Sequence, residues 1–308
     1  MGKGSRADIF NVTGWSDDDT TCFESGKCGI DKSHVGDAQG PREWIMDMPD
    51  PSRDLFCSVG PIRNNGMMNF DFEKVVSSSS SKRWFLEDIE YRLRVSGGTN
   101  EAILSAKKKG NCFLISAYPG SSHEKTYCAT LCMNFFGTVF KLQCRWCECC
   151  EPGATPFNVT TPESERQELG AIVYENNWKG TQPRKLTLAS PPMDRNQKFL
   201  VPYCPVQGHR PLDDAFINGD WRPLTVFTSK MPAWNPETKR HEACFSERVK
   251  KPSVRNFQLV HIEQPDMVML QFGKSEKRKY ALDVRHPLTP IQAFACALSS
   301  FEAGAMWT

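Results

Sequence analysis

From about residue 52 onward, short β-branched and aromatic runs alternate with clusters of Gly, Pro, Asn and Ser. Runs of this kind, bounded by turn-forming residues, are typical of β-strands. The pattern predicts strands over 69–76, 91–97, 101–107, 112–118, 137–146, 170–176, 185–190, 224–230, 254–262, 267–273 and 279–284. Gly97-Gly98 predicts a hairpin turn between two of them, because glycine enters the left-handed conformations that tight turns require.

The C-terminal segment predicts a helix that is buried on every side. Thr289 suits the N-cap, Pro290 the first helical position, and Gln292 the third residue of a capping box, while Gly304 suits the C-cap. Apolar residues then point in all directions around the axis: Ile291, Ala293, Phe294, Ala295, Cys296, Ala297, Leu298 and Phe301. A helix without a polar face must be enclosed by protein. The helix has roughly 14 residues and is about 21 Å long, whereas a bilayer requires ~20 apolar residues.

Many antiparallel strands and one wholly apolar helix favour a mainly β fold. We expect a closed antiparallel β-barrel of about twelve strands around the central hydrophobic C-terminal helix. Closure leaves no unpaired strand edge, and the helix fills a lumen too wide for side chains alone.

The chain divides into two regions by composition. Residues 1–51 hold five basic and ten acidic groups and show no sustained periodicity. We expect them to be an acidic, largely disordered segment, and we expect residues 52–308 to form the barrel domain. Within the first region, 42–48 could form a short docking helix or lie along the domain surface.

Charge and cysteine content narrow the function further. Residues 52–308 carry 33 basic and 26 acidic groups, an excess too small for a dedicated nucleic-acid binder but compatible with an anionic membrane surface. The N-terminus has no apolar signal sequence, so we expect most of the thirteen cysteines to be reduced thiols. The chain lacks the common catalytic motifs, and we expect no enzymatic activity, no cofactor and no nucleic-acid partner.

Several motifs resemble the tubby family, in order and over roughly residues 55–308. They are FLIS (113–116), NFFGTVF (134–140), ERQELGAIVYENN (165–177), QPRKL (182–186), MPAWN (231–235), ERVKKPSVRNFQLVH (247–261), MVMLQFGK (267–274) and HPLTPIQAFACALSSFE (286–302). The resemblance implies a twelve-stranded barrel threaded by its C-terminal helix. It also implies a peripheral membrane adaptor that binds phosphatidylinositol 4,5-bisphosphate, with members that carry membrane receptors into cilia through an N-terminal docking segment.

The family's headgroup site is only partly kept. Its Lys-x-Arg pair is replaced by Thr130 and Cys132, and Cys112 stands at the position of its binding Asn, with Asn111 one residue earlier. By resemblance, Arg166 and the basic run Lys107, Lys108 and Lys109 remain as phosphoinositide ligands. The alternatives are an ion pair between Arg166 and a nearby glutamate (163, 165 or 168), and a solvated hairpin end for the lysines.

A cysteine-rich stretch, CRWCECC at 144–150, permits several interpretations. Alternation with Phe140 and Leu142 places Cys144 in the core, which leaves Cys147, Cys149 and Cys150 in a loop. These three could hold a metal ion or be acylated, although simple reduced thiols need no further explanation.

Two functions follow. The first is a monomeric phosphoinositide-binding adaptor in membrane-receptor or ciliary trafficking, cytoplasmic and peripheral to the plasma or ciliary membrane, with the nucleus as a second location. The second is a protein-interaction scaffold that keeps the barrel but lacks specific lipid binding, its cysteine loop acylated or metal-bound.

Overall fold

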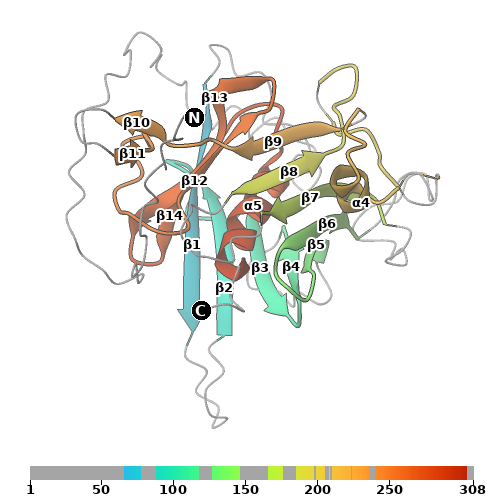
Figure 1. The fold of residues 1–308 in the computed structure, drawn as a ribbon. Coiled ribbons are helices and arrows are strands. Elements are labelled where there is room, and N and C mark those ends of the chain that lie inside the picture. The colour runs from blue at the N-terminus through green and yellow to red at the C-terminus, as the bar shows by residue number, and fades with distance from the viewer. Residues whose placement is uncertain are drawn as a thin grey trace, which may run out of the picture.

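The computed structural model describes residues 66–77, 88–117, 127–145, 166–175, 185–197, 199–204, 208, 210–222, 224–235 and 240–303. The predicted 1–51 segment and Cys147, Cys149 and Cys150 lie outside these ranges. Twelve antiparallel strands close into a barrel in the order β1-β14-β13-β12-β9-β8-β7-β6-β5-β4-β3-β2, with β1 and β2 paired to complete the ring (Figure 1). The predicted fold class is confirmed.

The barrel strands, in chain order, are β1 (Met68–Ser77), β2 (Asp88–Val95), β3 (Leu104–Lys109), β4 (Cys112–Ser116), β5 (Tyr127–Met133), β6 (Val139–Cys144), β7 (Glu168–Tyr174), β8 (Leu186–Ser190), β9 (Thr225–Ser229), β12 (Phe257–His261), β13 (Gln264–Glu276) and β14 (Lys279–Val284). A separate two-stranded sheet pairs β10 (Ala233–Asn235) with β11 (Arg240–Glu242). The described helices are α4 (Leu212–Ile217) and α5 (Pro290–Glu302).

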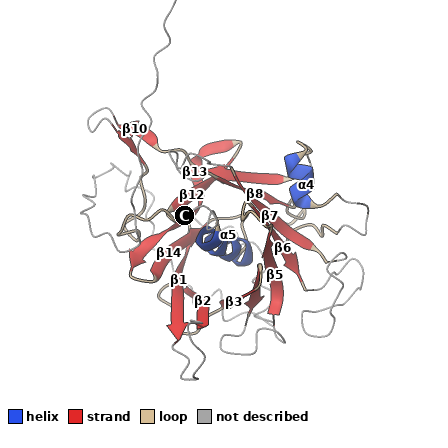
Figure 2. Ribbon diagram, turned by 60° about the horizontal axis from the view of Figure 1, so that its bottom comes forward, coloured by secondary structure: helices blue, strands red, loops and turns tan. Residues whose placement is uncertain are grey.

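Helix α5 occupies the barrel lumen, encircled by the strands (Figure 2). Its start is the predicted one: Pro290 is at the first position, and Thr289 and Gln292 form both hydrogen bonds of a capping box. The end differs slightly, because Ala303 is the C-cap, with an extended backbone and its N–H bonded to the Ser299 carbonyl. Every residue from Pro290 to Ser300 is buried, as an all-apolar helix requires. Neither described helix has the length and apolarity of a membrane span.

The few polar groups of α5 are paired inside the lumen. Gln292 Nε2 donates to the Leu169 carbonyl at 2.8 Å and to Ser190 Oγ at 2.7 Å, which ties the helix start to β7 and β8. Ser299 Oγ lies 2.9 Å from the hydroxyl of Tyr174, another β7 residue. Buried polar groups that are hydrogen-bonded avoid the cost of desolvation without a partner, so these bonds fix the helix position within the barrel.

An aromatic cluster fills the end of the lumen around the last turn of α5. Phe72 lies 5.6 Å from both Phe294 and Phe301, measured between ring centroids, and stacks on Phe301 at 11°. Tyr91 approaches Phe301 at 5.0 Å. Offset and edge contacts at these separations are favourable beyond the area they bury. The cluster joins α5 to β1 and β2, where the barrel closes.

Four elements were not predicted from the strand pattern. Strand β5 is buried on both faces, with Cys128 and Ala129 fully buried and Thr130 nearly so, so it lacks the alternation that marks a strand. Helix α4 has six residues and lies outside the barrel beside β7 and β8. Strands β10 and β11 have three residues each, too few for a periodic signal. The predicted Gly97-Gly98 turn does connect two antiparallel strands, β2 and β3, and Gly97 has a φ of +73°.

Candidate functional site

The residues expected to bind a headgroup fall on neighbouring strands, β3 to β7. Along this wall Phe113, Leu131 and Leu142 point into the core, so the residues that alternate with them face outward. Cross-strand register sets the outward residues in two rows: Lys109, Cys112, Cys132, Lys141 and Ala171 in one, and Lys107, Leu114, Thr130, Gln143 and Glu168 in the other. We call these two rows the β3–β7 face.

The three lysines do not act as one group. Lys107 and Lys109 belong to the β3–β7 face, and Lys107 Nζ pairs with Asp88 Oδ2 at 2.9 Å. Lys108 is on the opposite, inward-facing side of β3 and reaches Glu302 Oε2, at the end of α5, at 2.6 Å. Asn111 donates its side-chain amide to the Met133 carbonyl at 3.1 Å and so joins the β3–β4 turn to β5. Lys107 and Lys109 are therefore the lysines placed for a ligand on the outer wall.

Cys112 and Cys132 form a disulfide, so the prediction of reduced thiols is wrong for this pair. They are direct cross-strand partners with Cα atoms 4.0 Å apart, close to the spacing of non-hydrogen-bonded pairs in antiparallel sheets. Cys244 is also disulfide-bonded. The pairing was hidden from sequence reasoning because β5 was not predicted. By contrast Cys144 is buried and not disulfide-bonded, as predicted, and the same holds for Cys128, Cys204 and Cys296.

A cation that the sequence reasoning missed lies next to the disulfide. Lys141 of β6 is the direct cross-strand partner of Cys132 and faces the same way. Its Nζ pairs with Asp213 Oδ1 of α4 at 2.9 Å, and its side chain keeps 41% of its exposure. The signal was the alternation within β6, where Phe140 and Leu142 point inward and Lys141 must point outward. Lys141 therefore supplies a positive charge next to Cys132, which replaces a basic residue of the family's site.

The second row ends in a buried carboxyl group. Glu168 is 4% exposed, and its Oε2 accepts the backbone N–H of Leu212, the first residue of α4, at 2.7 Å. Burial raises the pKa of Glu168, and the Leu212 N–H and Lys141 offset that effect in part. Thr130, in the same row, is 5% exposed, and its hydroxyl has no hydrogen-bond partner among the described residues. This part of the wall is covered and does not accept a charged ligand as it stands.

Arg166 lies just before β7, half-buried, two residues before Glu168, where the strand begins. Four strand spacings of about 4.8 Å separate β3 from β7, so the lysines and the Arg166 end of β7 are about 19 Å apart along the wall. Of the glutamates considered as its partner, Glu163 and Glu165 lie outside the described residues, and Glu168 caps α4. The basic residues therefore flank the neutral centre, Thr130 and Cys132, from two sides.

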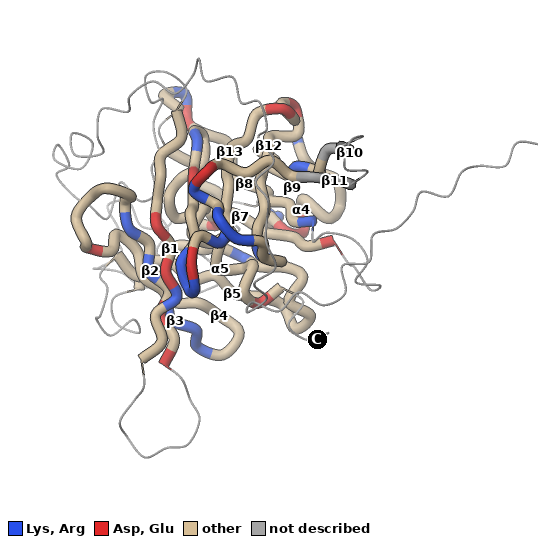
Figure 3. The backbone as a smooth tube through the Cα atoms, turned by 90° about the vertical axis from the view of Figure 1, so that its left-hand side faces the viewer, with Lys and Arg blue, Asp and Glu red and all other residues tan. Residues whose placement is uncertain are grey.

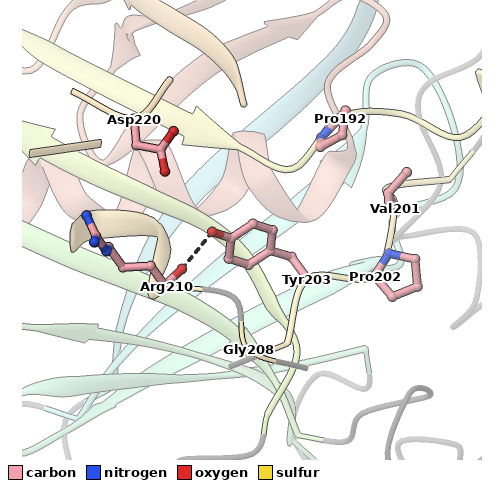
Figure 4. Close-up of a pocket in the computed structure, with 7 residues that line it drawn as sticks. All are labelled: Pro192, Val201, Pro202, Tyr203, Gly208, Arg210 and Asp220. Carbon is pink, nitrogen blue, oxygen red and sulfur yellow. Dashed lines mark hydrogen bonds between the residues drawn. The ribbon is translucent and has the colours of Figure 1, made fainter. Parts of the chain in front are cut away.

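A cavity of about 420 Å³ lies beside the start of β7 (Figure 4). Its lining comprises Pro192, Val201, Pro202, Tyr203, Gly208, Arg210 and Asp220. The Tyr203 hydroxyl donates to the Arg210 carbonyl at 2.6 Å, and the Tyr203 carbonyl accepts the Glu168 N–H at 2.8 Å. The cavity lining combines one basic, one acidic and several apolar residues, so it does not favour a ligand of either charge.

Within the described ranges, no three His, Cys, Asp or Glu side chains gather as a metal site. The three cysteines proposed for metal binding or acylation lie outside those ranges, so their role stays a prediction. Basic and acidic positions are interspersed along the described backbone in Figure 3.

Comparison with known proteins decides the family. A model described as "Tub family" matches residues 77–303. The chain belongs to the Tub family. This Tub-family chain is 32% identical over 211 residues to Tubby protein homolog 1 of Caenorhabditis elegans, covering 65% of the chain and 48% of that relative. It is 35% identical over 203 residues to human Tubby-related protein 3, covering 64% and 44%.

A third relative, Tubby-related protein 1 of Mus musculus, is 40% identical over 140 residues, covering 45% of the chain and 26% of that protein. The chain thus spans about half the length, or less, of the relatives it matches. Tub-family proteins in general bind phosphoinositides and are not known as enzymes. For this chain, the specific lipid, the membrane and the partners are proposals.

Proposed function

We propose that this protein is a non-enzymatic peripheral membrane adaptor that binds phosphatidylinositol 4,5-bisphosphate through the β3–β7 face and Arg166 beside it. In this proposal Lys107, Lys109 and Lys141 contact phosphate from one side and Arg166 from the other. Lys108 holds the end of α5, and Asn111 positions the turn that presents the lysines.

The observation that carries the proposal is the gathering of cations on one outer wall. Lys109 and Lys141 lie in the row that contains the disulfide, on either side of it, so the two substituted cysteines sit between positive charges. A charge-assisted bond to phosphate contributes about 1–3 kcal/mol, so losing two such contacts weakens binding about a hundredfold or more. Lys141 offsets part of that loss only when phosphate competes successfully with Asp213.

Following the family resemblance, the adaptor carries membrane-receptor cargo, including cargo bound for cilia, through its N-terminal segment, and acts as a monomer at the plasma or ciliary membrane. The match covers about half of the relatives' length, so these partners are part of the proposal and are not carried over from the relatives.

Vesicle flotation tests the lipid proposal. The full chain is floated with phosphatidylcholine vesicles that contain or lack phosphatidylinositol 4,5-bisphosphate, as wild type, Arg166→Ala, and Lys107→Ala with Lys109→Ala. Lys251→Ala is the control, an exposed lysine beside β13 on the opposite wall. We expect both site variants to lose most of the lipid-dependent flotation and the control to keep it. Equal flotation of all four proteins would rule out Arg166, Lys107 and Lys109 as residues that bind the lipid.

A second function, a protein-interaction scaffold without specific lipid binding, is favoured by one observation. The neutral Cys112–Cys132 disulfide and the covered Thr130 occupy the centre of the wall. If this function holds, with the loop cysteines acylated or metal-bound, wild-type flotation is independent of the phosphoinositide, and intact-protein mass spectrometry detects added acyl chains or zinc.

A further inference from the structure

Two phenylalanines are displayed to solvent at the tip of the β5–β6 hairpin. Phe135 is 79% exposed, the highest value among the large apolar residues of the described ranges, and Phe136 is 53% exposed. Their rings contact each other edge to face at a centroid distance of 5.4 Å. Each exposed phenyl ring leaves apolar area in water that burial elsewhere would remove, so this pair needs a physical explanation.

The hairpin tip, residues 134–137, is held in one conformation. The Gly137 N–H donates to the Asn134 carbonyl at 3.1 Å, and Gly137 takes the positive φ of 63° that closes the turn. Asn134 Oδ1 accepts the N–H groups of Thr138 and Val139 at 2.9 and 3.2 Å. The two rings thus occupy the corner positions of a turn in which the N–H groups of Gly137, Thr138 and Val139 are paired within the hairpin. A tip built in this way enters an apolar medium with fewer unpaired backbone groups.

Beside this tip lies the lysine-bearing turn between β3 and β4. Backbone and side-chain bonds between Asn111 and Met133 join the two turns, at 2.9 and 3.1 Å. From Met133 to Phe140 the hairpin contains no acidic residue, whereas the neighbouring turn follows three lysines. Apolar rings and cations therefore meet at the end of the barrel where α5 ends, since Lys108 pairs with Glu302 there.

We propose that the tip inserts Phe135 and Phe136 into the headgroup–acyl boundary of an anionic bilayer, with Lys107 and Lys109 among the headgroups. A bilayer is favoured over a protein partner because the exposed apolar surface is the corner of one turn, whereas a stable protein interface buries about 800 Å² on each partner. Apolar rings with adjacent cations are the composition of interfacial membrane anchors. The inference rests on the proposed function and adds a membrane contact that does not depend on recognition of a particular headgroup.

Lipid monolayers test insertion directly, because a protein that penetrates the film raises its surface pressure and one held only by charge does not. The full chain is injected beneath films of phosphatidylcholine and phosphatidylserine without phosphoinositide, as wild type and as Phe135→Ser with Phe136→Ser. We expect the wild type to insert and the double variant to lose most of the pressure rise. Its affinity for vesicles of the same lipids should fall about tenfold or more.

Two controls keep the result specific. Ile217→Ser with Trp221→Ser removes apolar side chains of similar exposure (61% and 45%) near α4 and should insert like the wild type. Phe135→Leu with Phe136→Leu should retain most of the insertion. If the double serine variant misfolds, Phe135→Ser alone should lower the pressure rise. Equal pressure rises for wild type and serine variants, or a wild type that binds vesicles without raising the pressure, would overturn insertion.

The same data separate this inference from headgroup recognition. Insertion into films without phosphoinositide, combined with flotation that does not respond to phosphatidylinositol 4,5-bisphosphate, supports the aromatic tip and contradicts the proposed headgroup site. Phosphoinositide-dependent flotation that survives loss of both rings, without insertion by the wild type, supports the headgroup site and contradicts the aromatic tip.

Discussion

Replacing Ala297 by Asp should unfold the barrel at neutral pH. Ala297 lies in the middle of α5, is fully buried, and belongs to the apolar core cluster. Its own carbonyl already accepts the Ser300 hydroxyl at 2.7 Å. A carboxylate at this position would therefore have neither water nor a partner prepared for it.

The cost can be worked out from the least expensive route, in which the aspartic acid stays protonated. Holding a carboxyl group neutral about three pH units above its usual pKa costs about 4 kcal/mol. An unpaired buried carboxyl adds about 1–3 kcal/mol, and the extra atoms in a close-packed lumen add about 1–3 kcal/mol. The total, about 6–10 kcal/mol, is comparable with the whole stability of about 5–15 kcal/mol that a domain possesses.

Urea unfolding followed by tryptophan fluorescence measures the effect, with Ala297→Ser as the matched control. We expect the serine variant to lose about 1 kcal/mol, because its hydroxyl can bond to a preceding helix carbonyl as Ser299 and Ser300 do. The aspartate penalty should shrink by about 2 kcal/mol at pH 5.5, since less work is needed to keep the group neutral. A soluble aspartate variant within about 2 kcal/mol of the wild type at pH 7 would refute burial of α5.

Three further changes have defined outcomes. The Cys112→Ser, Cys132→Ser variant should have a free energy of unfolding about 3 kcal/mol below that of the wild type without reductant, because the disulfide closes a loop of 20 residues. With dithiothreitol the two proteins should be equally stable, and a wild type whose stability does not change with dithiothreitol would contradict the disulfide. The stability of Glu168→Gln relative to the wild type should increase as pH rises, because the wild type must ionise a carboxyl group whose pKa is raised by burial. Urea unfolding at pH 4.5 and 7.5 measures this difference in free energy, and an equal difference at both pH values would contradict the raised pKa of Glu168. Cys132→Arg with Cys112→Ser should tighten binding to phosphatidylinositol 4,5-bisphosphate vesicles about tenfold, and no gain would contradict the mapping of the site.

The fold was predictable where side chains alternate or where capping residues mark an end. Strand β1 shows Met68, Phe70 and Phe72 buried between exposed neighbours, and Thr289 with Gln292 marks the start of α5. Prediction failed where burial does not alternate, as in β5, or where an element is too short to repeat, as in α4. Such elements are specified by their neighbours in the barrel and not by their own pattern.

The site was less predictable, because it depends on which residues face one another across strands. Family motifs gave Arg166 and the lysines as candidates, but only the register of β4 with β5 reveals that Cys112 meets Cys132. The role of Lys141 likewise depends on its pairing with β5 and on α4, which contributes Asp213 from 72 positions later in the chain. Contacts of this range leave no local signal in one sequence.

The most direct test of the account compares the affinity of the wild-type chain for two vesicle populations of equal surface charge. One contains phosphatidylinositol 4,5-bisphosphate, and the other contains enough phosphatidylserine to match its charge. Recognition by the β3–β7 face predicts at least about tenfold tighter binding to the first, the equivalent of one charge-assisted contact with phosphate. Equal affinity for the two populations would contradict headgroup recognition and leave only attraction to charge.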